Sequence, residues 1–490
     1  MCSFLILNFI IKNFDWVNYF QKFRGPDLTH NFNFNNFFFY HNLLHITGEV
    51  TKQPFIDEDN QIVALFNGEI YNYKEFGNYK SDGFCLIDLY KKYNTNFVKY
   101  LDGEYAICLF DFKKNIFIIS TDVFSKKPLW YSIGNDKLGL ASYESALKRS
   151  GLENRKKLLA NTTLIYNLET FELIEEKRVY EFKFNQFKNT YDDWCKAFVE
   201  SVRKRVDNDN YPVFVCLSSG YDSGAICCAL NILKKKYYTY TIIASENIDI
   251  INKRIEINKE NTINHQIVSL EVEEFLNIKK YIDLESEKFY YSIDGCKPVT
   301  EDKASVGMSK ICSLATIDKT RIYLSGQGAD EIVSDYGNKG KKLSSHSGFG
   351  GLYPTDLNQI LSNDPKEEMV WRSFYKGSQE SYLSKEEIIS GLHGIEGRYP
   401  YLDKDLVQEF LNLTPELKNR IYKAPLDYFL EKNNYPFEKG IKIGFSCDPR
   451  TKFTSYQEKK KKFKNFFKKM FFFFSFLILL ISYFINYLNR

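Results

Sequence analysis

The stretch Tyr211–Leu230, YPVFVCLSSGYDSGAICCAL, constrains the fold more than any other part of the chain. Its apolar residues 213–217 predict a buried strand, residues 218–224 a turn of small residues, and residues 225–230 the start of a helix. Such a turn presents unpaired backbone N–H groups at the positive end of a helix dipole, which favours a bound phosphate. The alternative is a plain strand, turn and helix, because Ser and Asp are common capping residues.

Several side chains of this turn suit a nucleotide. Gly220 lets the backbone approach a ligand closely, while Ser218 and Ser223 add hydroxyl donors. Asp222 can bind a Mg2+ ion that neutralises phosphate charge. The stretch lacks the GxxxxGK sequence of a Walker loop, so it predicts a phosphate site of another kind.

A second stretch, Ile322–Gly337, has the same design. Its sequence, IYLSGQGADEIVSDYG, predicts a short strand and a turn of small residues, followed by the carboxylates Asp330 and Glu331. Parallel strands of an open sheet end at one edge, so two turns about 100 residues apart can meet there. We therefore expect Asp222 and Asp330 to share a metal ion.

Length and charge narrow the class of protein. A chain of 490 residues predicts two or three domains, each able to bury a core. The 66 basic and 62 acidic residues leave a net charge of +4, with the basic excess in a C-terminal Lys run. This balance argues against a nucleic-acid partner. The ten Cys include no CxxC pair, which fits a reducing compartment and no structural zinc.

The amino terminus contains a candidate nucleophile. Residues 1–11 lack the basic segment of a signal peptide and predict a first strand with Cys2 at its tip. If Met1 is removed, Cys2 carries a free α-amine beside its thiol, so one residue can supply both nucleophile and base. The alternative is an incidental thiol.

Together these motifs resemble the glutamine-dependent asparagine synthetases. The resemblance runs from Cys2 to about Phe445 in the order of the family. It is carried by RGPD at 24–27, FNGEIYNY at 66–73, LDGEYAICLFD at 101–111, TDVFSKKPLWY at 121–131, SSGYDS at 218–223, LSGQGADE at 324–331 and GIEGRYPYLD at 394–403.

The resemblance implies an α/β fold in two domains. Residues 1–187 would form a glutamine amidotransferase domain, an αββα sandwich of the N-terminal nucleophile hydrolase type. Residues 188–450 would form a parallel-sheet α/β ATP-pyrophosphatase domain. Local patterns predict a low-complexity strand or loop over residues 31–40 and a solvated helix or loop over residues 247–264.

The same resemblance assigns site residues by position. The catalytic residues would be Cys2 and Lys442, and Lys423 matches another late lysine of the family. The residues that would bind glutamine are Asn67, Gly68, Glu69 and Asp82. ATP binding falls to Leu217, Ser218, Ser219, Gly220, Tyr221, Asp222, Ser223, Ser325 and Gly326, and the acceptor site to Gln327, Glu396 and Arg398. Asp222 and Asp330 would hold the metal.

Some positions depart from the family pattern or admit two interpretations. Leu43 replaces an Arg that binds the glutamine α-carboxylate, so that anion would need another partner. Gln327 stands where the family has an acidic side chain near the incoming nitrogen, and Gln cannot accept a proton. Arg398 could bind the carboxylate of the acceptor or form a structural salt bridge.

The C-terminal segment, residues 451–490, lies beyond the resemblance. Seven Lys fall between 459 and 469, and the mostly apolar residues 470–488 are long enough to cross a bilayer. This pattern predicts a cytoplasmic enzyme anchored by its tail. The alternative is an incidental extension from an AT-rich gene, or a gene-model artefact.

The expected activity is ATP-dependent asparagine synthesis through a β-aspartyl-AMP intermediate, with ammonia taken from glutamine. ATP and Mg2+ would be required, the small-molecule partners would be aspartate, glutamine and ATP, and a homodimer is a further expectation. Two alternatives remain. One is a related amide ligase with another acceptor, similar to the β-lactam synthetases, and the other is a catalytically degenerate, membrane-anchored paralogue.

Overall fold

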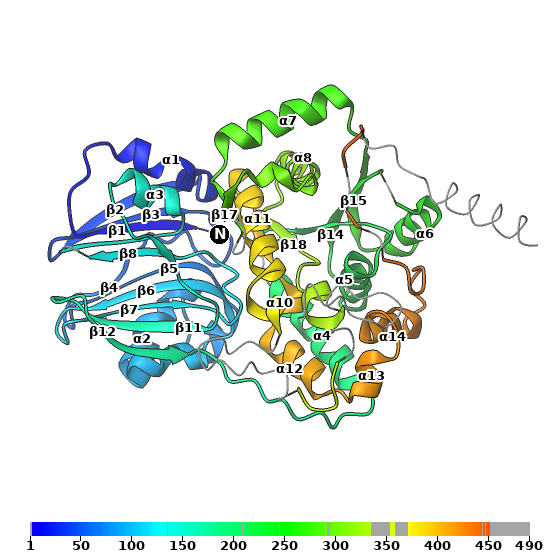
Figure 1. Cartoon of the computed structure of the whole chain (residues 1–490), viewed down its shortest axis with the longest axis horizontal. Coiled ribbons are helices and arrows are strands. Elements are labelled where there is room, and N and C mark those ends of the chain that lie inside the picture. Colours follow the sequence, from blue (N-terminus) through cyan, green and yellow to red (C-terminus); the bar gives the residue numbers. More distant parts are fainter. Residues whose placement is uncertain are drawn as a thin grey trace, which may run out of the picture.

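The structure is a computed structural model, and it forms two domains that pack side by side (Figure 1). It describes residues 2–134, 136–207, 210–244, 246–291, 295–334, 353–357, 371–442, 444–445 and 447–450. The statements below concern these residues. The predicted membrane span at 470–488 lies outside them.

The N-terminal domain contains two antiparallel sheets. In one the strand order is β10-β8-β9-β1-β3-β2, and in the other it is β12-β11-β7-β6-β5-β4. The elements are β1 Ser3–Leu7, α1 Phe14–Arg24, β2 Leu28–Phe34, β3 Phe37–Leu43, β4 Phe55–Asp57, β5 Ile62–Ile70, α2 Cys85–Tyr93, β6 Gly103–Asp111, β7 Ile116–Thr121, β8 Trp130–Gly134, β9 Lys137–Ala141, α3 Glu144–Arg149, β10 Lys156–Lys157, β11 Thr162–Asn167 and β12 Leu173–Arg178.

Strand β1 shows why this domain is layered. Phe4 and Ile6 point into the core between the two sheets, whereas Leu5 and Leu7 point to the other face, where α1 and α3 cover the sheet. Alternate residues of a strand face opposite sides, so a strand with apolar residues on both faces must be covered on both. Helix α2 packs beside the second sheet. The predicted αββα sandwich is confirmed.

The C-terminal domain is built on a parallel sheet with the order β15-β14-β13-β18-β19. Its elements are α4 Asp192–Val206, β13 Val213–Cys216, α5 Tyr221–Ile232, β14 Tyr237–Ile242, α6 Ile248–Asn258, β15 Thr262–Val268, α7 Val272–Glu285, β16 Phe289–Tyr291, β17 Gly295–Lys297, α8 Ala304–Ile317, β18 Ile322–Leu324, a π-helix Ala329–Ser334, α10 Arg372–Tyr375, α11 Ser378–Leu392, β19 Glu396–Arg398, α12 Lys404–Asn412, α13 Pro415–Asn419 and α14 Ala424–Lys432.

Helices cover both faces of this sheet. One apolar core joins the sheet to α4, α5 and α14, and a second joins it to α7, α8 and α11. The described residues include no helix long and apolar enough to cross a membrane. The predicted parallel α/β domain is confirmed.

The structure makes two local predictions more precise and corrects a third. The stretch 31–40 belongs to a regular hairpin of β2 and β3, with Asn35 and Asn36 in the turn at φ of 46° and 65°. The stretch 247–264 contains helix α6 and the start of the edge strand β15. Helix α5 begins at Tyr221 instead of Ala225, so most of the predicted small-residue turn is the first turn of the helix.

Candidate active sites

The first site is a pocket around Cys2 in the N-terminal domain, with about 380 Å³ of empty space. The backbone N of Cys2 donates to Oδ1 of Asn67 at 2.9 Å, and Asn67 is fully buried. Nδ2 of Asn67 has no hydrogen-bond partner in the described part of the chain. This amide can therefore donate to an oxyanion that forms beside the thiol.

Glycine at position 68 lets two strands approach closely next to Cys2. Gly68 has φ of +133°, and a Cβ there would lie 1.8 Å from the carbonyl oxygen of Glu104. No other residue fits this backbone without displacing the neighbouring strand. Gly68 therefore holds Asn67 and Glu69 at the pocket.

Glu69 and Asp82 are buried carboxyl groups that line the pocket. Glu69 accepts from Oγ1 of Thr47 at 2.7 Å and pairs with Arg398 at 3.1 Å, and burial raises its pKa to about 8. Asp82 accepts from the Ile70 N–H at 2.9 Å, and burial raises its pKa to about 6. The four predicted glutamine-binding positions thus surround Cys2, although their role in binding stays a prediction.

The second site joins the two predicted turns of the C-terminal domain. Nζ of Lys423 lies 2.5 Å from Oδ1 of Asp222 and 3.1 Å from Oδ1 of Asp330. Lys442 adds a second ammonium 3.5 Å from Asp330, and Tyr422 donates to the same carboxylate at 3.1 Å. The two turns therefore converge, as the sequence predicted.

Strand adjacency and one glycine explain this convergence. β13 and β18 are hydrogen-bonded neighbours in parallel, so the residues after each strand end at the same edge. A Cβ on Gly326 would lie 2.9 Å from Cβ of Asp222, closer than such atoms can approach. Gly326 is therefore needed for the close approach of the turns.

The electrostatics of the carboxylate pair are asymmetric. Burial and the neighbouring Asp330 raise the pKa of Asp222. Although burial also acts on Asp330, the charges of Lys423 and Lys442 lower its pKa to about 2. Asp330 is therefore ionised at neutral pH, and the pair needs cations nearby to remain charged.

The residues present fit a magnesium ion. One cation, the Lys423 ammonium, already lies within ion-pair distance of both carboxylates. The described residues contain no group of three or more His, Cys, Asp or Glu that could hold a metal without help. Mg2+ often takes one or two carboxylates and completes its shell with water and phosphate oxygens. Asp222 and Asp330 match that pattern.

The first turn does not leave its N–H groups unpaired, contrary to the sequence-based expectation. The Ser218 N–H donates to Oγ of Ser223 at 3.0 Å, and the Gly220 N–H to Oγ of Ser218 at 3.2 Å. The N–H of Ser219 donates to Glu246, and its hydroxyl reaches the same oxygen at 2.5 Å. The two donors of Ser219 are thus directed at an anion, and a phosphate bound by them would have to displace the Glu246 carboxylate.

The predicted acceptor residues lie in different surroundings. Arg398 is buried, pairs with Glu396 at 2.6 Å and Glu69 at 3.1 Å, and donates to the Arg205 carbonyl oxygen at 2.7 Å. This geometry favours the structural salt bridge for Arg398 and Glu396. Gln327 lies beside the second turn, where its backbone N–H donates to Oγ of Ser325 at 3.0 Å.

Sequence reasoning missed a buried carboxyl group at this turn. Oγ of Ser325 donates to Glu386 at 2.5 Å, and burial raises the pKa of Glu386 to about 7. Glu386 comes from helix α11 and belongs to none of the motifs. The bridging role of Lys423 was also missed, although the family pattern had pointed to the residue itself.

Arg398 connects the two sites. Its side chain pairs with Glu69, which lines the Cys2 pocket, and its carbonyl oxygen accepts from the Ser325 N–H at 2.9 Å. One residue of β19 thus contacts the thiol pocket of one domain and the phosphate turn of the other.

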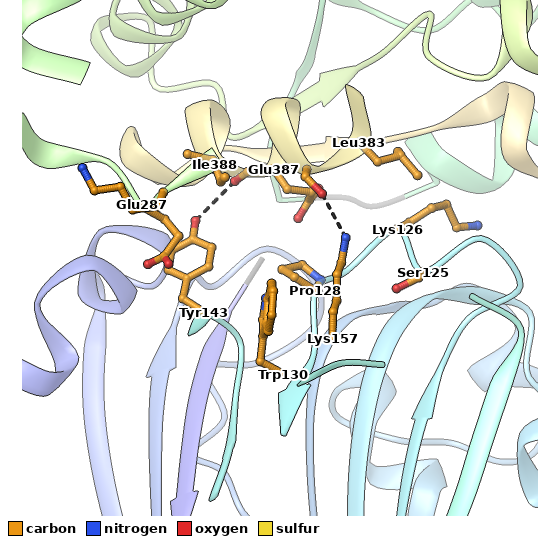
Figure 2. Close-up of a pocket in the computed structure, with 12 residues that line it drawn as sticks. Ser125, Lys126, Pro128, Trp130, Tyr143, Lys157, Glu287, Leu383, Glu387 and Ile388 are labelled. Atoms are coloured by element: carbon orange, nitrogen blue, oxygen red, sulfur yellow. Dashed lines mark hydrogen bonds between the residues drawn. The ribbon is translucent and has the colours of Figure 1, made fainter. Parts of the chain in front are cut away.

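Buried charges hold the two domains together next to this connection. Glu387 of α11 pairs with Arg24 at 2.8 Å and with Lys127 at 2.9 Å, both from the N-terminal domain. Figure 2 shows a pocket at this junction, where Trp130 and Tyr143 face α11 and the Tyr143 hydroxyl donates to the Glu387 carbonyl oxygen at 3.4 Å. The junction therefore relies on ion pairs as well as apolar contacts.

The fold and the two sites define a class of enzyme in which an N-terminal nucleophile amidotransferase domain is joined to a ligase domain with a parallel sheet. Comparison with known families supports this class. Residues 12–182 match a glutamine amidotransferase domain, and residues 193–432 match asparagine synthase. The chain belongs to the glutamine-dependent asparagine synthetase family.

Relatives named glutamine-hydrolyzing asparagine synthetases extend over most of the chain. One from Methanocaldococcus jannaschii is 26% identical, covering 83% of this chain and 76% of the relative. Another from Triphysaria versicolor is 26% identical, covering 81% and 66%. One from Arabidopsis thaliana is 25% identical, also covering 81% and 66%. The chain therefore spans slightly less than two thirds of the two plant relatives.

Proposed function

We propose that the chain makes asparagine from aspartate and ATP, using ammonia that Cys2 releases from an amide. The observation that carries this proposal is the Lys423 bridge, 2.5 Å from Asp222 and 3.1 Å from Asp330. It brings two small-residue turns and two carboxylates to one edge of a parallel sheet, where such folds bind ligands. The family of the chain gives the reaction class.

At the first site the thiol of Cys2 is the nucleophile. Burial raises its pKa to about 11, so the thiol is neutral at rest and needs a base. The α-amine of Cys2, free once Met1 is removed, takes the thiol proton as sulfur attacks the amide carbon. Asn67 Nδ2 stabilises the oxyanion, ammonia leaves with the proton, and water hydrolyses the thioester.

At the second site a carboxylate of aspartate attacks the α-phosphorus of ATP and pyrophosphate leaves. The Ser218–Ser223 turn and the Ser325–Gly326 turn would hold the phosphates. Lys423 and Lys442 would offset the negative charge that builds up on them. Bound at Asp222 and Asp330, Mg2+ would supply further charge neutralisation at the leaving pyrophosphate.

The last step needs a proton acceptor. Ammonia attacks the acyl carbon, AMP leaves, and the nitrogen must lose a proton. Gln327 cannot take it, because an amide is not a base at neutral pH. Glu386, bonded to Ser325 and with its pKa raised to about 7 by burial, is the group we assign to this role.

A single assay tests the proposal. Purified protein is given ATP, Mg2+ and aspartate, with glutamine or with ammonia, and pyrophosphate and asparagine are both measured. Equal amounts of the two products with ammonia support the synthetase. No pyrophosphate release with any acid would overturn it and favour a catalytically degenerate paralogue.

One observation favours a second candidate, a related ligase with another acceptor. Arg398 and Glu396, which the resemblance places in the acceptor site, are paired with each other at 2.6 Å and buried. Arg398 is therefore not free to bind the carboxylate of aspartate. Pyrophosphate release that requires a different acid, as in an enzyme similar to the β-lactam synthetases, would support this candidate.

A further inference from the structure

The pocket around Cys2 is lined by acidic, apolar and neutral polar groups. Three of its hydroxyl groups already donate hydrogen bonds: Thr47 to Glu69, Thr51 to the carbonyl oxygen of Glu49, and Ser81 to Asp82. Among its described lining residues, Glu49, Glu69 and Asp82 carry carboxyl groups and His45 is the one basic side chain. Neither Lys nor Arg occurs in that lining. A pocket of this composition attracts a cationic group and offers little to an anion.

From this lining we propose that the amide hydrolysed by Cys2 carries a free α-ammonium group but no free α-carboxylate. The simplest such compound is glutamine α-amide, and the N-terminal glutamine of a peptide belongs to the same class. The inference rests on the proposed function of Cys2 as an amidase and names its substrate class.

The cations nearest to the pocket are already paired. Arg398 pairs with Glu69 at 3.1 Å, and Arg321 pairs with Asp27. Lys80 lies 3.6 Å from Glu49 at the rim, where its side chain is 72% exposed. An ammonium in water contributes little to binding an anion, so Lys80 does not replace a buried cation.

The basic lining residue is also engaged. Nε2 of His45 lies 2.9 Å from the carbonyl oxygen of Gly48, a contact that requires this nitrogen to carry a hydrogen and donate it. Its backbone N–H donates to Asp27 at 2.8 Å. The backbone and the carbonyl contact together hold His45 at the edge of the pocket.

The wall beside Cys2 is apolar where a counter-ion would be needed. Leu43 is 7% exposed and lines the pocket together with Leu44, Ile46 and Phe66. A carboxylate placed against such side chains loses its hydration and gains no hydrogen bond. A neutral amide or peptide group at the same place avoids most of that cost.

An ammonium group, in contrast, has a partner in the pocket. The carboxyl group of Asp82 is buried, and its pKa is raised to about 6 by burial and by the charge of Glu396. A substrate ammonium next to it would stabilise the ionised form, whereas a substrate carboxylate would add to the repulsion. Both effects favour the same substrate class.

The chemistry is ordinary amide hydrolysis. Sulfur of Cys2 forms a bond to the side-chain amide carbon, the C–N bond breaks, and nitrogen leaves as ammonia with the thiol proton. Water then hydrolyses the thioester to the free acid. The masked α-carboxyl group takes no part in these steps.

The test compares ammonia release from L-glutamine and from L-glutamine α-amide by the full chain with Met1 removed, with Cys2→Ala as the blank. We expect kcat/KM for the α-amide to exceed that for glutamine by about tenfold or more. Leu43→Arg should reverse the preference, because it supplies the missing cation, whereas the size-matched Leu43→Met should leave it unchanged.

The outcomes separate this inference from the proposed function. A tenfold preference of the unmodified chain for glutamine, lost in Cys2→Ala, overturns the inference and leaves the glutaminase in place. No Cys2-dependent ammonia from either amide overturns both. If Leu43→Arg fails to fold, the comparison of the two amides as substrates of the unmodified chain still tests the inference.

Discussion

The two sites handle negative charge in opposite ways. In the N-terminal pocket, Glu69 and Asp82 lie beside Cys2 and no Lys or Arg appears among the described lining residues. In the C-terminal site, two carboxylates share Lys423, and Lys442 lies 3.5 Å from one of them. The comparison teaches that the chain places two lysines beside the carboxylates where phosphates would bind, whereas the described lining of the thiol pocket contains neither Lys nor Arg.

The largest expected effect is that of a change at Cys2, which should abolish the activity of the first site and leave that of the second unchanged. Cys2→Ala removes the nucleophile, so amide-dependent ammonia release should fall by about 10⁴-fold. Pyrophosphate release driven by added ammonia should stay within about twofold of the original chain, because the second site is untouched. A parallel loss of the ammonia-driven reaction would show that the sites are not independent. Both rates are measured on the same preparation.

A smaller loss is expected from removing the shared cation. Lys423→Met should lower ammonia-driven pyrophosphate release by about 10²–10³-fold, because a cation at the phosphates is lost and two carboxylates repel each other. Lys439→Met is the matched control, since Lys439 pairs with Asp427 at 3.2 Å and is 52% exposed. Equal activity of the two variants would contradict the role given to Lys423.

Removing the buried ion pairs between the two domains should lower the stability of the protein. Glu387 is 2% exposed and pairs with Arg24 and Lys127, so Glu387→Gln removes the carboxylate from buried Arg24 and leaves buried Lys127 with the more distant Glu104, at 4.0 Å. We expect the free energy of unfolding in urea to fall by about 3 kcal/mol. Lys80→Ala, which breaks an exposed pair with Glu49, should change it by at most about 1 kcal/mol. Similar losses from both changes would argue against a charge-stabilised junction.

The smallest expected effect concerns the proton acceptor. A carboxyl group accepts a proton only when ionised, and burial raises the pKa of Glu386 to about 7. The ammonia-driven rate, expressed per free ammonia, should therefore rise with pH through about 7. Glu386→Gln should remove that rise and lower the rate by about tenfold.

Glu380→Gln on the same helix is the control for this change, since Glu380 pairs with Lys157 at 3.3 Å on the side of the N-terminal domain. It should keep the pH profile of the original chain. An unchanged profile in Glu386→Gln would move the role of proton acceptor to another group or to water.

Much of the fold, including the two phosphate turns, could be predicted from local sequence patterns. The apolar strand before Ser218 and the one before Ser325 were predictable, and so was their meeting, because parallel neighbours end at one edge. Strand β15 was not, because the composition around it is biased toward Lys and Asn and its sequence, TINHQIV, has no regular alternation of apolar and polar residues. The same bias hid the hairpin of β2 and β3, although Asn35 and Asn36 gave a turn signal.

Contacts between distant segments could not be predicted from the sequence. Glu386 reaches Ser325 from a helix 61 positions further along, and no local motif marks it. Arg398 had two interpretations until its partners were known, because a buried guanidinium can serve a substrate or a neighbouring carboxylate equally well. Which of these holds depends on the packing of two domains.

The ladder between β13 and β18 has one further consequence. Because the two strands are direct neighbours, the position of Asp222 against Asp330 depends on that pairing and not on the roughly hundred residues that separate them in the chain. Length changes in the excursion through β15 and α7 would leave the catalytic geometry intact, whereas α6 supplies Arg254, which donates to the Ser218 and Gly220 carbonyl oxygens of the first turn. Relatives can therefore acquire or lose surface segments there without rebuilding the reaction centre.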